Sequence, residues 1–139
     1  MKQVSVLLLL LGFCLPVLPA RAEVISIDTA ITAFEKQIMR DEGIVSRPAN
    51  ITATKLARQQ IRDGLRELEF VITHFERHFA AIDPQMIKDM NRIFKAEEAE
   101  AANERFSHRH LDSTRNMVAA NLPVKKAILK RARDMVYGR

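Results

Sequence analysis

The sequence has few of the residues that interrupt helices or build metal clusters. Its 139 residues include four glycines, five prolines, one cysteine and no tryptophan. So little glycine and proline disfavours collagen-like chains, disordered chains and most all-β folds. A single cysteine excludes an internal disulfide framework and any cysteine-rich zinc or iron–sulfur site. The length allows one domain at most.

The motifs of the common enzyme classes are also missing. The sequence contains no Gly-x-Ser-x-Gly elbow, no glycine-rich phosphate loop and no His-Glu-x-x-His motif. It has no Glu-x-x-His pair of the kind that ferritin-like di-metal sites use. Carboxylates are plentiful, but their spacing singles out no acid–base pair. We therefore expect a non-catalytic protein that requires no cofactor.

Residues 1–22 have the pattern of a secretory signal peptide. Lys2 gives a positive start, an apolar stretch follows over residues 4–18, and the segment Ala20–Ala22 supplies small residues before a cut after Ala22. The apolar stretch is too short for a membrane anchor, which needs about 20 residues, and prolines interrupt it. Lipidation at Cys14 is disfavoured because the bulky Phe13 precedes it. We expect cleavage and a periplasmic or secreted bacterial protein.

The mature chain would be a single helical domain, residues 23–139, without cysteine. Cleavage removes Lys2 and Arg21, which leaves 20 basic against 17 acidic residues and a net charge of +3 instead of +5. A balance this close to neutral does not indicate nucleic-acid binding.

The apolar spacing predicts helices throughout residues 23–139. A first helix is expected from Ser26 or Asp28 to about Glu42, with Gly43 as its end. A long second helix runs to Asp83 because seven apolar residues recur at alternating spacings of four and three, which makes a heptad-like seam. These residues are Ile61, Leu65, Leu68, Ile72, Phe75, Phe79 and Ile82.

A third helix is expected from Pro84 past Lys95, with a bend near residues 107–113. A cap at residues 121–123 would start a last helix over residues 124–137. The sequence therefore predicts an all-α fold: a small bundle of three to five helices, or a long antiparallel hairpin, with a C-terminal basic amphipathic helix. The length of the second helix also makes a homodimer an open alternative.

In an antiparallel hairpin about Asp83–Pro84, two residues lie side by side when their numbers sum to about 167. The stripe of Arg58, Arg62 and Arg66 then lies beside Glu100 and Glu104. Exposed pairs of this kind, worth about 0–1 kcal/mol each, would select the register more than they stabilise the fold.

Two histidines invite a metal interpretation. His74 and His78 share one helical face at a spacing of four, which suits transition-metal binding. His108 and His110 lie about 22 Å further along the hairpin, so a four-histidine site is not expected. The plainer interpretation is that His74 and His78 flank the core as partly exposed polar residues. A metal site or a b-type haem held by His74 and His78 is the alternative.

Two features favour contact with a partner. Phe70 points away from the seam, so it either packs under another helix or contacts a partner. The C-terminal segment carries a dense set of basic residues, which we expect to contact an acidic partner or an anionic membrane surface. Docking of its apolar side on the bundle is compatible with this role. Arg131 falls near the apolar side and must extend to water or pair with an acid. The basic residues are Lys125, Lys126, Lys130, Arg131 and Arg133.

These features together predict an exported, periplasmic helical interaction protein. It would act as a chaperone or adaptor, or as a small component of an envelope secretion or conjugation apparatus. Its expected partner is a protein of the cell envelope.

Overall fold

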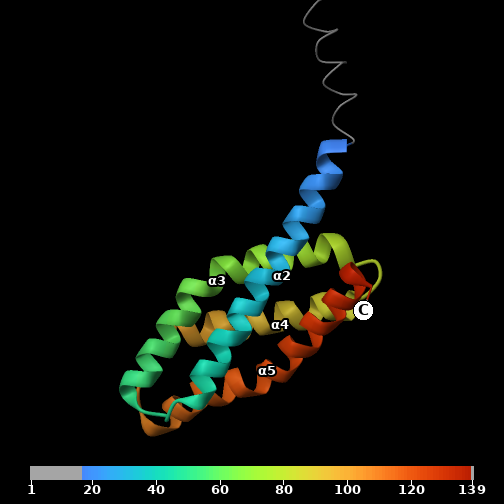
Figure 1. The fold of residues 1–139 in the computed structure, drawn as a ribbon. Helices are drawn as coiled ribbons and strands as arrows, with labels where there is room; N and C mark the ends of the chain where they lie inside the picture. Colours follow the sequence, from blue (N-terminus) through green and yellow to red (C-terminus); the bar gives the residue numbers. More distant parts are fainter. Residues whose placement is uncertain (1–16, 139) are drawn as a thin grey trace, which may run out of the picture.

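The computed structural model describes residues 17–138 and contains four long helices (Figure 1). No strand occurs in this part of the chain, which confirms the all-α prediction. The helices are α2 (Val17–Ser46), α3 (Ile51–Phe79), α4 (Pro84–Ala101) and α5 (His108–Tyr137).

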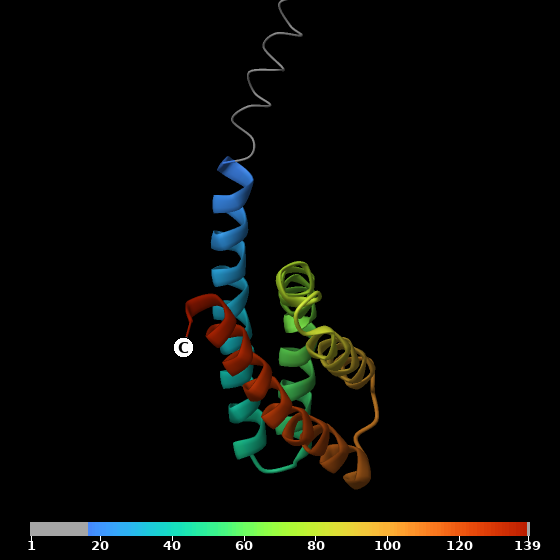
Figure 2. The ribbon, with the colours of Figure 1, turned by 90° about the vertical axis from the view of Figure 1, so that its right-hand side faces the viewer.

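α3 and α5 each contact all three other helices, and α3 packs most extensively. It forms a hairpin with α4, while α5 returns across α2. The N-terminal part of α2 extends beyond the other three helices (Figures 1 and 2). The predicted signal peptide lies mostly in residues 1–16, outside the described residues, and its last six residues begin α2. Among the residues that are described, no helix is long and apolar enough to span a membrane.

The core lies where the apolar stripes of the four helices meet. Phe34 of α2 contacts Phe75 of α3 edge to face at 5.6 Å, and Phe75 contacts Phe79 in the same way at 5.3 Å. Five of the seven residues of the predicted seam are buried and Leu65 is partly buried, so α3 packs along this seam. Ile82 is the exception, because α3 ends at Phe79 and leaves this side chain 72% exposed in the turn.

Polar caps set two of the helix starts. Asn50 accepts a hydrogen bond from the backbone N–H of Ala53 at 2.8 Å, and Asp83 accepts one from Met86 at 3.2 Å. Each cap satisfies an amide that has no partner within the helix. The predicted start of a helix at Pro84 is confirmed, but the preceding helix ends at Phe79 and not at Asp83 as predicted.

Both predicted ends of the first helix and the predicted start of the last helix are also wrong. α2 starts before Ser26. It also continues through Gly43 to Ser46, because burial of Ile44 stabilises one more helical turn. α5 runs without a break through Pro123, although proline lacks an N–H and costs a helix interior about 3 kcal/mol. Val118 and Ile128 are buried on either side of it, and their packing outweighs that cost.

The register of the α3–α4 hairpin differs from the expected one by one helical turn. Arg62 donates to the carbonyl of Ala101 at 2.6 Å, whereas the expected hairpin placed Arg62 beside Arg105. The difference arises because the turn occupies the residues after Phe79 and does not centre on Asp83–Pro84. Glu100 does lie beside the predicted arginine stripe, but its partner is Arg58, at 3.3 Å, and not the residues nearer Arg66 that the expected register placed there.

Candidate functional site

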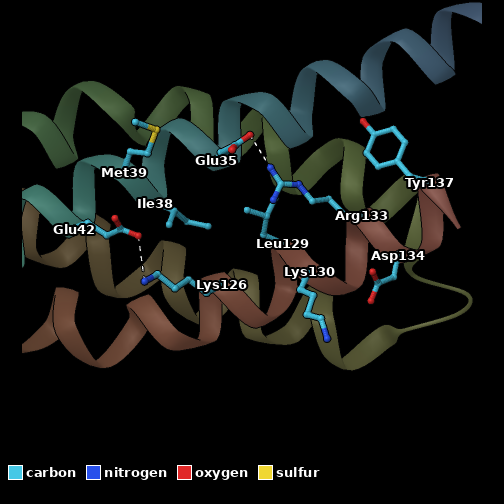
Figure 3. Close-up of a pocket in the computed structure, with 10 residues that line it drawn as sticks. All are labelled: Glu35, Ile38, Met39, Glu42, Lys126, Leu129, Lys130, Arg133, Asp134 and Tyr137. Carbon is cyan, nitrogen blue, oxygen red and sulfur yellow. Dashed lines mark ion pairs between the residues drawn. The ribbon is translucent and has the colours of Figure 1, made fainter. Parts of the chain in front are cut away.

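A groove of about 900 Å³ runs between α2 and α5 (Figure 3). Its floor is apolar: Ile38 and Leu129 are buried there, whereas Met39 is 66% exposed. The side chains that line it recur three or four residues apart on both helices, so each helix turns one ridge towards the groove. α2 contributes Glu35, Ile38, Met39 and Glu42, and α5 contributes Lys126, Leu129, Lys130, Arg133, Asp134 and Tyr137.

Ion pairs cross the groove between its two ridges. Lys126 lies 3.1 Å from Glu42, and Arg133 lies 2.7 Å from Glu35 (Figure 3). All four side chains are about half exposed, so water screens both pairs and each contributes only about 0–1 kcal/mol. The pairs can therefore open or change partners at little cost.

The C-terminal end of the groove is fixed by Tyr137. Its hydroxyl donates a hydrogen bond to Asp28, which ties the last turn of α5 to α2. This hydrogen bond raises the pKa of the phenol, since ionisation would remove the donor. Nearby Arg133 opposes the shift, but the pKa remains raised.

Lys125 corrects the prediction for the basic segment. Its side chain is completely buried, not displayed with Lys126 and Lys130. Arg131 pairs with Asp83 at 3.0 Å, as its position near the apolar side required. Of the five basic residues, Lys130 is the one that forms no ion pair within residues 17–138. The segment therefore offers less free positive charge than its composition suggests.

The buried Lys125 belongs to an ionic cluster that joins three helices. Its Nζ lies 2.6 Å from Asp41 on α2 and 2.9 Å from Glu97 on α4. Arg40 reaches the same two carboxylates at 2.7 and 2.6 Å. Burial lowers the pKa of Arg40, but the two carboxylates outweigh burial and raise it overall, so the guanidinium stays charged. Two cations and two anions make the cluster neutral, as a buried site requires.

Gly64 on α3 gives Arg40 the room to reach this cluster. A Cβ at position 64 would lie 2.5 Å from Nη1 of Arg40. The amide of Gln37 donates to the carbonyl of Gly64 at 2.8 Å and fixes the same helix crossing. At Gly43, by contrast, a Cβ would meet nothing within 4 Å.

Arg58 organises the connection between α4 and α5. Its guanidinium donates to Glu100 at 3.3 Å and to Thr114 at 3.2 Å. It also donates to the backbone carbonyl of Arg105 at 2.6 Å and lies 4.7 Å from the centre of the Phe106 ring. The sequence placed Arg58 in an exposed stripe, but it is buried.

Phe70, His74 and His78 lie together on one side of α3. The Phe70 ring is 37% exposed and contacts the His74 ring, with 4.2 Å between centroids. His74 Nδ1 lies 2.8 Å from the carbonyl of Phe70. The buried Nε2 of His78 has no hydrogen-bond partner among the described residues. Over residues 17–138 no three His, Cys, Asp or Glu side chains gather closely enough to hold a metal ion.

A second apolar surface lies at the end of the bundle where α3 begins. Ile51 is 50% exposed and Leu56 is 45% exposed, beside a shallow hollow of about 720 Å³. The hollow opens between the α2–α3 loop and Leu111 of α5. No charged ridges like those of the α2–α5 groove border it.

Comparison of the chain with family models, with curated proteins and with solved structures gives no match. The arguments about function therefore depend on the chain's own residues.

Two elements of the site escaped the sequence reasoning. The α2 ridge was missed because Met39 and Glu42 read as the outer side of an ordinary amphipathic helix. The ionic cluster was missed although Asp41 continues the series of Phe34 and Ile38 at a spacing of three. A charged residue at a core position was the available signal.

Proposed function

We propose that this chain is an exported, non-catalytic helical interaction protein that binds a partner protein in its α2–α5 groove. It acts as a chaperone or adaptor, or as a small component of a bacterial envelope secretion or conjugation apparatus. The groove carries the proposal, because it combines an apolar floor, an exposed methionine and charged rims. Concave apolar surfaces with polar edges are where proteins commonly bind other chains.

Met39 supports this role most directly. Met39 lines the groove and is 66% exposed, so it contributes little to the stability of the isolated bundle. Its flexible thioether adapts to varied apolar surfaces, and methionine is frequent at adaptable binding sites. Burying it under a partner removes apolar surface from water and favours association.

The groove is better suited to a protein than to an anionic membrane. Its lining carries three acidic and three basic side chains, so it has no net charge. Attraction to anionic lipid needs several uncompensated basic residues. The pattern of residues 1–22 supports export, and the absence of catalytic motifs supports binding without catalysis.

The test places a photoreactive amino acid at position 39 of the full chain in cells. The captured partner is identified, purified and titrated against wild type, Met39→Asp and the control Leu56→Asp. We expect Met39→Asp to weaken binding at least tenfold and Leu56→Asp to leave it unchanged. Equal affinity for all three proteins would show that the groove is not the binding surface.

His74 and His78 support a second candidate, a bundle that binds a metal or a b-type haem. The favouring observation is the buried Nε2 of His78, which lacks a hydrogen-bond partner. Elemental analysis and absorbance spectra of protein purified from cells test it. Stoichiometric metal or a haem absorption band that His74→Ala and His78→Ala abolish would establish this function, and protein free of both would refute it.

A further inference from the structure

The two rims of the α2–α5 groove carry opposite charges. The α2 rim is acidic, with Glu35 and Glu42 seven residues apart, or about 10.5 Å along the helix. The α5 rim is mainly basic, with Lys126, Lys130 and Arg133. Asp134 lies one turn beyond Lys130 and reduces, but does not reverse, the positive charge of that rim. The buried Ile38 and Leu129 lie beneath the two rims, which ion pairs join at 3.1 Å and 2.7 Å (Figure 3).

This arrangement matches the requirements of one kind of ligand. A helix that lies in a groove between two helices presents a central apolar stripe to the floor and one flank to each rim. In coiled coils the charges on such flanks choose the partner and its direction. Lining residues that span about three turns set the length of segment that fits.

We propose that the partner segment is an amphipathic helix of about three turns whose two flanks differ in charge. Carboxylates lie along the flank that faces α5, and basic residues lie along the flank that faces α2. This inference rests on the proposed function and specifies the chemistry of the partner. The helix covers Met39 and exchanges the ion pairs within the chain for pairs with the partner.

Charge balance distinguishes this helix from simpler ligands. A helix with two acidic flanks would place carboxylates against Glu35 and Glu42, and one with two basic flanks would place amines against Lys126 and Arg133. Like charges in contact disfavour both complexes. Because the pairs that close the groove are half exposed, the mixed helix can replace each lost pair with an equivalent one.

The test uses four labelled helical peptides with one shared apolar stripe and anisotropy as the readout. Their flanks are Glu and Lys, Glu and Glu, Lys and Lys, or Gln and Gln. We expect the mixed peptide to bind about tenfold more tightly than either single-sign peptide. Several exposed ion pairs distinguish the complexes, and each changes the binding affinity by a factor of up to about five. Added salt should reduce this advantage.

Variants of the rims provide the matched controls. Glu35→Gln with Glu42→Gln should relieve the penalty on the Glu–Glu peptide, and Lys126→Gln with Lys130→Gln should relieve it for the Lys–Lys peptide. Glu69→Gln with Glu76→Gln removes two exposed carboxylates at the same spacing on α3. This control should leave the affinity for all four peptides unchanged.

The possible outcomes separate this inference from the proposed function. Equal binding of all four peptides, lost in Met39→Asp, would overturn the flank charges and leave the groove as a binding site. Tightest binding of the Glu–Glu peptide would also overturn the inference. Binding of no peptide, or binding only to vesicles of anionic lipid, would overturn both proposals.

Discussion

Replacing Lys125 by methionine should destabilise the protein far more than the same change at Lys126. Lys125→Met leaves Asp41 and Glu97 buried with Arg40 as their one cation. Breaking a buried ionic pair from one side costs about 3–5 kcal/mol. At a domain of this size such a loss lowers the melting temperature by roughly 10–20 °C. The Lys126 side chain is 53% exposed, so its loss should cost less than about 0.5 kcal/mol.

A second substitution tests whether charge balance is the cause. Glu97→Gln alone leaves two buried cations with one carboxylate and should also cost about 3–5 kcal/mol. Lys125→Met with Glu97→Gln leaves the neutral pair of Arg40 and Asp41. The double variant should therefore lose at least 2 kcal/mol less than the sum of the two single losses, within the range seen for residues in one network.

The measurement is urea unfolding followed by far-ultraviolet circular dichroism at neutral pH. The four proteins are wild type, both single variants and the double variant, with Lys126→Met as the matched control. Losses below 1 kcal/mol in both single variants, or strictly additive losses in the double variant, would refute the reasoning.

Three further predictions follow from features of the same helices. Gly64→Ala should destabilise the protein, because the added methyl meets the Arg40 guanidinium, which two carboxylates hold in place. Gly43→Ala should stabilise it by up to about 1 kcal/mol. Chemical unfolding compares the two variants, and a gain in stability at both positions would contradict the close approach of Arg40 to Gly64. Tyr137 is the one tyrosine, so absorbance near 295 nm should show its phenol ionising above its ordinary pKa of about 10, with Asp28→Asn returning the pKa towards that value. Because the pKa of the phenol is raised in the folded protein, the hydrogen bond stabilises the fold below pH 10, and this stabilisation is lost as the pH rises through the raised pKa. Ionisation of wild-type Tyr137 at its ordinary pKa would contradict the hydrogen bond to Asp28. N-terminal sequencing of protein from fractionated bacteria should begin at Glu23 in the periplasm, and an intact N-terminus in the cytoplasm would contradict export.

The helices were predictable because their apolar periodicity is long and regular. The seam of α3 follows spacings of three and four from Ile61 to Phe79, and few other structures satisfy that pattern. Boundaries were less predictable, because tertiary packing decided them. Burial of Ile44 carried α2 past Gly43, and buried residues around Pro123 kept α5 continuous.

The sequence indicated residues on one side of the groove but not how the groove is built. It identified Lys126, Lys130 and Arg133 as a basic ridge, and these residues do line the groove. It could not supply the opposite ridge, since which helix lies beside α5 depends on contacts between residues more than 80 positions apart. It also assigned Lys125 to the surface, because composition does not distinguish a solvated lysine from one that meets two buried carboxylates.

The contacts of Arg58 have a consequence for domain swapping between two copies of the chain. α5 is joined to the rest of the bundle by residues 102–107, and one guanidinium from α3 holds the carbonyl of Arg105 within that connection. A connection held in this folded-back form keeps α5 on its own α2. Without it the connection can straighten and let α5 dock on the α2 of a second copy, which is the usual origin of domain-swapped dimers. Arg58 thus favours closure of the chain on itself, and Arg58→Ala should populate swapped dimers at high protein concentration.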